Sequence, residues 1–454
     1  MNALHRRSLA VSAAVVLGIV LTAVAYRPGV MSGDSLFLYG QALREEVSSG
    51  KPPLTAFIWM WILKLWPSPT ALLMVQAGLF WAGLGAIVHF SKLRTSCAAL
   101  AVLGIGLWPA VFALIGTLWL DVWLAAWFLL FVGMALTAMA RRSTALLMLS
   151  FIPLWSGLST RLNALPAVMP LAIWIVALFD LRFNVGRRTR SLLAVSAGLM
   201  VVLVGTSLVF ARAVTPNQLD ATGRPLQMAL YHDLAGISVR SGVLVMPSHV
   251  YDSIPNLTLA DVTEAYDPAD ANRLIYDPRW SSWAFYTSDV GKRRELRALW
   301  ARTVTANPLR YVQVRLEVMA TILQLQGVFY PFHVGIDKNE LGLEFPPRAS
   351  YERMTGVFTA LAPFLFRGWI YAGVALAVVI VGARRRRWTA VAVSASGLCY
   401  VLPYFVVTTG SDYRYVLWMV VATLISLLLF IGEPIAWRVP ASARARDATP
   451  EIAL

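Results

Sequence analysis

Long runs of apolar residues alternate with short polar stretches along most of this chain. A helix needs about 20 apolar residues to cross a bilayer core of about 30 Å, and several runs approach that length while others are shorter. The runs predict an all-α polytopic membrane protein with about ten transmembrane helices. The expected spans are residues 9–26, 70–90, 97–118, 122–140, 145–159, 164–179, 192–211, 368–383, 388–407 and 415–431.

Residues 35–66 break this pattern and read as two juxtamembrane helices. The first, residues 36–46, is amphipathic and too short to cross a bilayer, so we expect it to lie in the membrane interface. The second, residues 54–66, follows a break at residues 48–53 and ends before Pro67.

Residues 212–353 are charged, contain prolines and are far less apolar than their flanks. We expect a mainly helical outer domain here, with a helix at residues 292–306 and an amphipathic helix at residues 311–329 on the membrane surface. An N-terminal transmembrane module, residues 1–211, would precede it. A C-terminal transmembrane module with a cytoplasmic tail, residues 354–454, would follow it.

Basic clusters stand at every second boundary between the apolar runs. Because short cytoplasmic loops are enriched in Lys and Arg, we expect these boundaries and both termini in the cytoplasm. The net charge of +15 is interpreted as this topology signal together with contact to membrane lipids, and not as nucleic-acid binding. The clusters are Arg6-Arg7, Lys92 with Arg94, Arg141-Arg142, Arg187-Arg188-Arg190 and Arg384 to Arg387.

A hydrophobic content of 58% and a mean hydropathy of +0.64 exclude an ordinary soluble protein. Cys97 and Cys399 both lie in apolar runs, so they imply neither a disulfide framework nor a metal site. The basic start of the chain and its first apolar run fit either a cleavable signal peptide or a retained first helix. We favour the retained helix because many spans follow it.

The remaining boundaries carry a different set of polar residues. Membrane proteins keep ionisable groups near the bilayer where those groups have a function, so we expect a site on the non-cytoplasmic face. The set consists of Asp34, Asp121, Arg161, Asn163, His232, Asp233, Asp412, Tyr413, Arg414 and Tyr415.

The two isolated acids of this set each allow two interpretations. Asp34 follows the first span, where apolar surroundings would raise the pKa of a carboxyl group toward the range of a general base. The alternative is that Asp34 caps the helix that begins at Ser35. Asp121 interrupts an apolar run, and it could bind a divalent cation, orient an acceptor or cap the following helix.

Arg161 and Arg414 are candidate phosphate ligands, because a guanidinium group offers a fixed fork of donors. Asn163, Tyr413 and Tyr415 stand beside them as supporting residues. For each arginine the alternative is snorkelling to lipid headgroups.

His232 and Asp233 are adjacent where the chain enters the outer domain. They could orient an acceptor or a metal ion, or they could form a buried structural pair. The sequence has no phosphate-cradling glycine loop, no zinc-ligand pair at helical spacing and no nucleophile elbow. Nucleotide-driven chemistry on the cytoplasmic side therefore has no support.

The order of these features carries more information than any one of them. An acid after the first span is followed by juxtamembrane helices, a Pro-Pro step and a second outer acid. An Arg-x-Asn hairpin, a large late outer domain and an Arg-Tyr step before the final span complete the order. This order resembles the GT-C superfamily of integral-membrane glycosyltransferases, which includes protein O-mannosyltransferases and lipid A aminoarabinose transferases. The resemblance covers nearly the whole chain through short motifs.

The resemblance implies an inverting glycosyltransferase on the outer, periplasmic face of a bacterial cytoplasmic membrane. The donor would be a polyprenyl-phosphate sugar and the acceptor a glycan or a lipid. Asp34 matches the family's catalytic base by position, and Asp121 matches its second acid. Arg161 and Arg414 would receive the leaving phosphate. The family's His-Pro-Pro step is Lys51-Pro52-Pro53 in this chain, so Lys51 could bind phosphate in place of histidine.

Two other functions stay open as alternatives. A transporter or flippase of lipid-linked saccharide should carry polar residues at mid-membrane depth and internal repeats, whereas the spans here are almost uniformly apolar. An O-antigen polymerase also joins many spans to a large outer loop, but the early acid followed by juxtamembrane helices argues against it. The sequence identifies neither the sugar nor the acceptor, and of cofactors it suggests only a divalent cation, for which Asp121, His232 and Asp233 are the candidate residues.

Overall fold

The structure, a computed structural model, describes residues 3–432 apart from residues 49–50, 184, 187, 216–223, 326–332, 334, 347–355, 359 and 361. Within this described part of the chain the regular secondary structure is helical, and extended contacts are limited to three isolated bridges. The predicted all-α membrane class is confirmed for these residues. The predicted cytoplasmic tail, residues 433–454, lies outside them.

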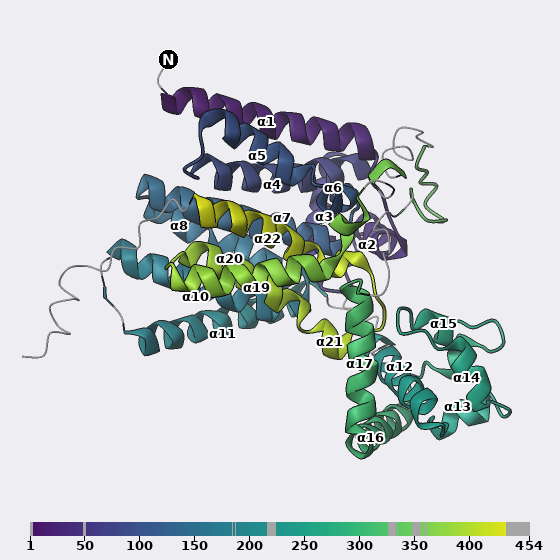
Figure 1. The fold of residues 1–454 in the computed structure, drawn as a ribbon. Helices are drawn as coiled ribbons and strands as arrows, with labels where there is room; N and C mark the ends of the chain where they lie inside the picture. The colour runs from purple at the N-terminus through teal and green to yellow at the C-terminus, as the bar shows by residue number, and fades with distance from the viewer. Residues whose placement is uncertain are drawn as a thin grey trace, which may run out of the picture.

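Long apolar helices run side by side and form a bundle (Figure 1). Among the described residues, seven helices are long and apolar enough to cross a membrane. The first five are α1 (Ala3–Tyr26), α4 (Pro69–His89), α7 (Leu120–Arg141), α10 (Leu165–Phe183) and α11 (Thr189–Val214). The last two consist of α20 (Trp388–Val401) with α21 (Tyr404–Val407), and of the 3-10 turn η4 (Tyr413–Val416) with α22 (Leu417–Ile431).

The expected count of ten spans is not confirmed, because three of the expected spans are bent or short. α5 (Thr95–Gly106) and α6 (Pro109–Ile115) meet at an angle of 63°, since Pro109 begins a new helix, and they form a broken span or a re-entrant pair. The shorter apolar helices are α8 (Thr144–Leu149), α9 (Phe151–Thr160) and α19 (Gly368–Arg384).

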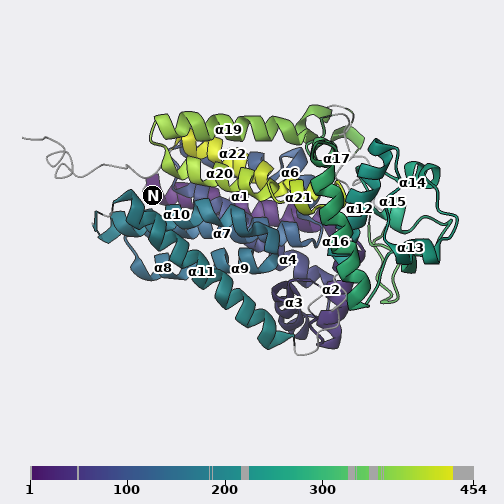
Figure 2. The same ribbon diagram turned by 90° about the horizontal axis from the view of Figure 1, so that it is seen from below.

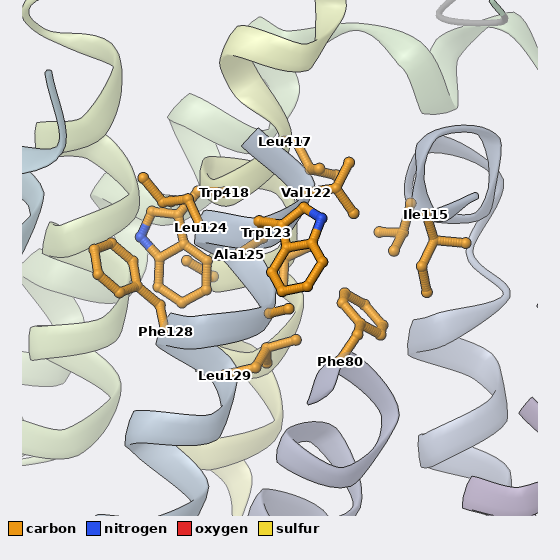
Figure 3. Packing of buried hydrophobic residues seen from close by; sticks show 14 of the residues in the cluster. Phe80, Ile115, Val122, Trp123, Leu124, Ala125, Phe128, Leu129, Leu417 and Trp418 are labelled. Carbon is orange, nitrogen blue, oxygen red and sulfur yellow. The ribbon is translucent and has the colours of Figure 1, made fainter. Parts of the chain in front are cut away.

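α7 packs against α4, α9 and α22 and forms much of the bundle core. Trp123 of α7 lies between Phe80 of α4 and Trp418 of α22, and Phe128 of α7 lies beside Trp418 (Figure 3); all four side chains are buried. The rings of Phe128 and Trp418 meet edge to face with centroids 5.1 Å apart, a geometry that aromatic pairs favour.

Two glycines bring α4 and α7 together. A Cβ atom at Gly83 would stand 2.6 Å from the backbone nitrogen of Leu130, and one at Gly133 would stand 2.8 Å from the carbonyl oxygen of Gly83. Small residues at helix crossings allow this close approach in membranes. The close approach at these positions sets the distance between α4 and α7, the helix that carries Asp121 in its first turn.

The two predicted juxtamembrane helices are present as α2 (Gly33–Arg44) and α3 (Pro53–Leu65). They pack on each other, and α3 also packs on α4 and α9. Both lie toward the end of the bundle where a second domain is found (Figure 2).

This second domain covers residues 224–325 at one end of the bundle (Figures 1 and 2). It falls within the segment that the sequence predicts to lie outside the membrane, and it is named the extramembrane domain for that reason. It has a hydrophobic core of its own, to which Tyr231, Leu274 and Phe285 belong. Its helices are α12 (Arg224–Ser241), α13 (Ser248–Ser253), α14 (Leu259–Ala265), α15 (Asn272–Ile275), α16 (Val290–Ala306) and α17 (Pro308–Ile322), with the turn η2 (Ser282–Ala284). α16 is the helix predicted at residues 292–306. α17 covers the start of the amphipathic helix predicted at residues 311–329, whose last four residues lie outside the described chain.

The basic clusters gather at the opposite end of the bundle. α7 and α19 begin beside the extramembrane domain and end at the opposite end of the bundle. Their last residues are Arg141 and Arg384. Arg7 of α1 donates hydrogen bonds to the carbonyl oxygens of Val88 and His89 at the end of α4. The two sets of boundary residues distinguished in the sequence therefore lie at two ends of one bundle.

Candidate functional site

Six charged side chains from five segments meet where the bundle joins the extramembrane domain. The segments are the start of α2, the residues before α3, the start of α7, the α9–α10 connection and the residues from 412 into η4. This group is named the ion cluster, and it consists of Asp34, Lys51, Asp121, Arg161, Asp412 and Arg414. It holds three cations and three carboxylates, so its formal charge is balanced.

Asp34 lies in the first turn of α2, and its side chain is half exposed. One carboxylate oxygen contacts the Lys51 ammonium group, and the other lies 3.0 Å from Nη2 of Arg414. The N-cap position belongs to Ser32, and the backbone N–H of Gly33 donates to Asp337 at 2.8 Å. The carboxylate of Asp34 is therefore directed at cations and does not cap the helix.

The charges around Asp34 decide its protonation. Burial by itself would raise the pKa of the carboxyl group, but Lys51 and Arg414 outweigh it and lower that pKa to about 2. Burial lowers the pKa of Lys51, against the effect of Asp34. Asp34 is ionised at neutral pH as long as both cations face it.

Asp121 is buried in the first turn of α7. Its Oδ2 lies 2.5 Å from Nη1 of Arg161, and its Oδ1 accepts a hydrogen bond of 2.6 Å from the hydroxyl of Tyr400. Tyr404, one helical turn after Tyr400, donates to the same oxygen at 3.5 Å. The carboxylate oxygens thus face these partners, and the capping interpretation of Asp121 is not the one observed.

Arg414 connects the two acids that the sequence singled out. Its Nε lies 2.9 Å from Asp412 and 3.9 Å from Asp121, while Nη2 reaches Asp34. The guanidinium group lies over the ring of Trp119, 4.8 Å from its centroid. Asp412 also accepts a hydrogen bond from the backbone N–H of Arg414, which fixes the start of η4.

The predicted supporting residues divide into two groups. Asn163 accepts a hydrogen bond of 3.2 Å from Nε of Arg161, and the ring of Tyr415 lies beneath the guanidinium groups of Arg161 and Arg414. Tyr413 is buried elsewhere, with its ring 6.2 Å from that of Phe366. Tyr413 therefore supports packing in the bundle and not the ion cluster.

His232 and Asp233 are not part of the ion cluster. Both are buried in the extramembrane domain, where Nε2 of His232 lies 3.0 Å from the carbonyl oxygen of Asp267. Asp233 binds Nη2 of Arg315 at 2.6 Å and accepts a hydrogen bond from the indole of Trp300. Burial lowers the pKa of His232 to about 4 and raises the pKa of Asp233. The structural interpretation of this pair is the one that the geometry favours.

Several residues of the site carried no clear signal in the sequence. Tyr400 and Tyr404 reach Asp121 from almost the other end of the chain. Their only local signal is a pair of hydroxyl groups four residues apart in an apolar run. Met31, just before α2, pairs with the backbone of Gly335 and Asp337, so a distant segment also fixes the position of Asp34.

The residues present suit an anion better than a metal ion. No group of three metal-binding side chains occurs within the described residues, and both Asp34 and Asp121 face guanidinium or ammonium groups. A metal role for Asp121 stays a prediction. A small pocket beside the cluster has a volume of about 10 Å³, enough for roughly one water molecule, so a phosphate group could enter only if side chains move. The pocket is lined by Asp34, Ser35, Leu38, Leu118, Trp119, Leu120, Arg161 and Arg414.

Comparison of the chain with protein-family models, with curated proteins and with solved structures found no match.

Proposed function

We propose that this protein is a glycosyltransferase that moves a sugar from a polyprenyl-phosphate donor to a glycan or lipid acceptor at the ion cluster. The observation that carries the proposal is the convergence of Asp34, Lys51, Arg161 and Arg414, which come from four separate segments, on one partly exposed point. Glycosyl transfer from a phosphate donor needs a base for the acceptor hydroxyl and positive charge for the leaving oxygen. Both are present within a few ångströms.

In the proposed reaction Asp34 takes the proton of the acceptor hydroxyl. The acceptor oxygen forms a bond to the anomeric carbon from the face opposite the phosphate, and the bond from that carbon to the phosphate oxygen breaks. The leaving polyprenyl phosphate keeps the electron pair, and its negative charge is balanced by Arg414, Arg161 and Lys51. Inversion at the anomeric carbon follows from the single displacement.

In this proposal the basicity of Asp34 depends on whether Lys51 and Arg414 face its carboxylate. A carboxylate with a pKa of about 2 is a weak base. A donor phosphate competes with Asp34 for Lys51 and Arg414, because both prefer the more highly charged oxygen atoms. As those cations turn to the phosphate, the pKa of Asp34 rises toward the range in which it can accept a proton. Donor binding would thus prepare the base.

A lipid donor also needs an apolar surface beside the site. A groove of about 800 Å³ runs between α10 and α11, and its lining is almost entirely apolar. It begins at Leu165, two residues after Asn163, and extends along α11 to Leu193. A prenyl chain in this groove would have its phosphate end near Arg161.

The positive-inside distribution supports an ion cluster on the non-cytoplasmic face, which in a bacterium would be the periplasmic face of the cytoplasmic membrane. The end of the bundle opposite the site carries the basic clusters. Cysteine labelling tests this: an impermeant thiol reagent should modify Trp283→Cys in intact cells and should not modify Arg386→Cys.

The decisive experiment uses the purified protein in nanodiscs with a polyprenyl-phosphate sugar labelled in the sugar. Loss of label from the lipid, with appearance of free polyprenyl phosphate, is the expected result when an envelope glycan extract is added. Comparison of surface glycans between a deletion strain and its parent then identifies the acceptor. Unchanged glycans with lipid-linked saccharide retained on the inner leaflet would favour the flippase instead, and shortened O-antigen chains with intact subunits would favour the polymerase.

A further inference from the structure

α16 and α17 contact each other, and each carries an exposed face that the described part of the chain leaves uncovered. Together these faces are named the α16–α17 face. It consists of Leu309, Val312 and Leu316 on α17 with Arg294, Arg297, Arg302 and Arg310.

The apolar half of this face is a stripe along α17. Leu309, Val312 and Leu316 are 78%, 41% and 55% exposed, and their spacing of three and four residues puts them on one side of the helix. Val314 and Val318, on the other side, are fully buried. Both sides of α17 therefore carry apolar residues. Within the described residues only the side with Val314 and Val318 is covered.

The basic half belongs mainly to α16. That helix carries five Lys and Arg residues and a single acid, Glu295, which accepts hydrogen bonds from the backbone and side chain of Ser248 and so faces α13. Among the described residues, no carboxylate lies within 4.0 Å of the guanidinium groups of Arg294, Arg297 or Arg302. All three arginines are exposed, and within the described residues no carboxylate neutralises their charge.

The arrangement in space shows what these faces meet. α17 runs across the direction of the long apolar helices, at the end of the bundle (Figure 1). α17 lies beside the bundle, α16 joins the end of α17 that is farther from it, and α13 and α14 lie farther out in both views (Figures 1 and 2). α17 also packs against α21, where Val406 is 52% exposed beside the bundle. A bilayer around the bundle would end facing α16 and α17.

We propose that the α16–α17 face docks on the headgroup layer of the adjacent leaflet and binds anionic phospholipids. An exposed apolar stripe accompanied by exposed arginines is the pattern of a helix that lies in the membrane interface. The basic half adds an attraction for anionic headgroups that the amphipathic pattern alone does not give. The proposal does not depend on the glycosyltransferase assignment.

A docked face would fix the extramembrane domain relative to the bundle. α17 contributes Arg315, which donates a hydrogen bond of 2.8 Å to the carbonyl oxygen of Thr408, four residues before Asp412 of the ion cluster. The lipid composition of the leaflet would in this way affect the mobility of a segment that ends in the site.

The test uses the full chain with Cys97→Ala and Cys399→Ala, one copy per nanodisc, and an environment-sensitive fluorophore on Val312→Cys. Discs contain either zwitterionic lipid alone or a mixture with phosphatidylglycerol. The fluorophore is expected to be buried and quenched by lipid-attached quenchers in the anionic discs and less so in the zwitterionic discs. A label on Trp283→Cys, in the turn η2, is the matched position that should respond to neither lipid.

Charge variants separate the two halves of the face. Since each arginine at an anionic surface contributes about fivefold to the docked population, R294Q/R297Q/R302Q should abolish the difference between the two lipids. Leu316→Gln should reduce quenching in both lipids, while Val243→Gln, an exposed apolar residue at the end of α12, should not. Equal exposure of the label at position 312 in both lipids would overturn the proposal. Burial of the label only in discs that hold two copies, or only after a soluble polyanion is added, would assign the face to another partner. Either result would also overturn the proposal.

Discussion

Two buried aspartate–arginine pairs in this molecule have almost the same length and different surroundings. Asp121 and Arg161 lie 2.5 Å apart in the ion cluster, and Asp233 and Arg315 lie 2.6 Å apart in the extramembrane domain. The side chains of the second pair are each 1% exposed. In the first pair the aspartate is equally buried, but the arginine is 20% exposed.

The partners explain the difference. Arg315 divides its donors between Asp233 and the carbonyl oxygen of Thr408, and Trp300 donates to the same carboxylate, so this pair is closed by the protein. Arg161 shares its surroundings with Arg414, which is partly exposed and binds the half-exposed Asp34. We call the ion cluster the open cluster and the Asp233–Arg315 pair the closed pair. At the open cluster a phosphate can replace a carboxylate without leaving a buried charge unpaired, and at the closed pair it cannot.

The two pairs are also connected through the chain. Thr408, which the closed pair holds, begins a segment whose Thr409 and Ser411 form backbone hydrogen bonds with the extramembrane domain. The same segment continues to Asp412 and Arg414. We interpret the closed pair as the support for one side of the open cluster.

The largest expected effect is at the open cluster. Asp34→Asn preserves the shape of the side chain but removes the base, so transfer should fall by about a hundred- to ten-thousand-fold. Binding of polyprenyl phosphate should persist or tighten, because Lys51 and Arg414 lose their carboxylate partner. Sugar transfer and polyprenyl-phosphate binding by the nanodisc-bound protein are the two measurements. Glu45→Gln, which removes an exposed acid paired with Lys64 at the end of the same helix, is the control. Near-normal transfer by the Asn variant would leave Asp121 as the next candidate base.

Breaking the closed pair should cost stability instead. Arg315→Gln leaves Asp233 buried without its cation, and the extramembrane domain should lose about 3–5 kcal/mol. Arg240→Gln is the matched control, because Arg240 and Glu317 also join α12 to α17 but are 18% and 42% exposed, and that change should cost about 1 kcal/mol or less. Proteolysis in increasing urea measures both. Equal losses in the two variants would mean that burial does not distinguish the pairs.

The closed region should also respond to acid. Burial lowers the pKa of His232 from its usual 6.5 to about 4, so between those pH values the unfolded chain binds a proton that the folded domain excludes. The domain should therefore lose stability as the pH falls from about 6.5 toward 4, by roughly 3 kcal/mol in all, and should not change for this reason above pH 7. Asp233, whose pKa is raised, has the opposite effect near pH 4, so urea unfolding is best compared between pH 5 and 7. His232→Gln should flatten this dependence, and an unchanged slope would show that other groups cause it.

Local sequence patterns predicted those parts of the molecule that depend on short segments. The apolar runs predicted helices at every expected span, because about 20 apolar residues have few alternatives in a membrane. An acid such as Asp121 in an apolar run was only a weak signal by itself, and it became a site prediction through the order of the other features along the chain. Contacts between distant segments could not be predicted in this way: nothing near Asp121 reveals Tyr400, and nothing near Asp233 reveals Arg315. The same limit explains why His232 and Asp233 could not be separated from the ion cluster by their position in the chain.

The smallest expected effect compares the ion cluster with the Asp233–Arg315 pair most directly, because the same change, Arg→Lys, is made in each. Lys keeps the charge and loses the planar fork. The lysine of Arg414→Lys cannot reach Asp34, Asp121 and Asp412 together. Transfer should therefore fall by roughly ten- to a hundredfold through the loss of one charge-assisted hydrogen bond. Urea unfolding of the extramembrane domain should stay as in the wild type. Arg315→Lys can keep its contact with Asp233 but leaves the carbonyl oxygen of Thr408 without its donor, so stability should fall by about 1–3 kcal/mol. Any loss of transfer in that variant should be accompanied by faster hydrogen exchange at residues 408–416. If Arg414→Lys destabilises the protein as much as Arg315→Lys does and transfer falls only in proportion, both arginines are structural, and the ion cluster is not the phosphate site.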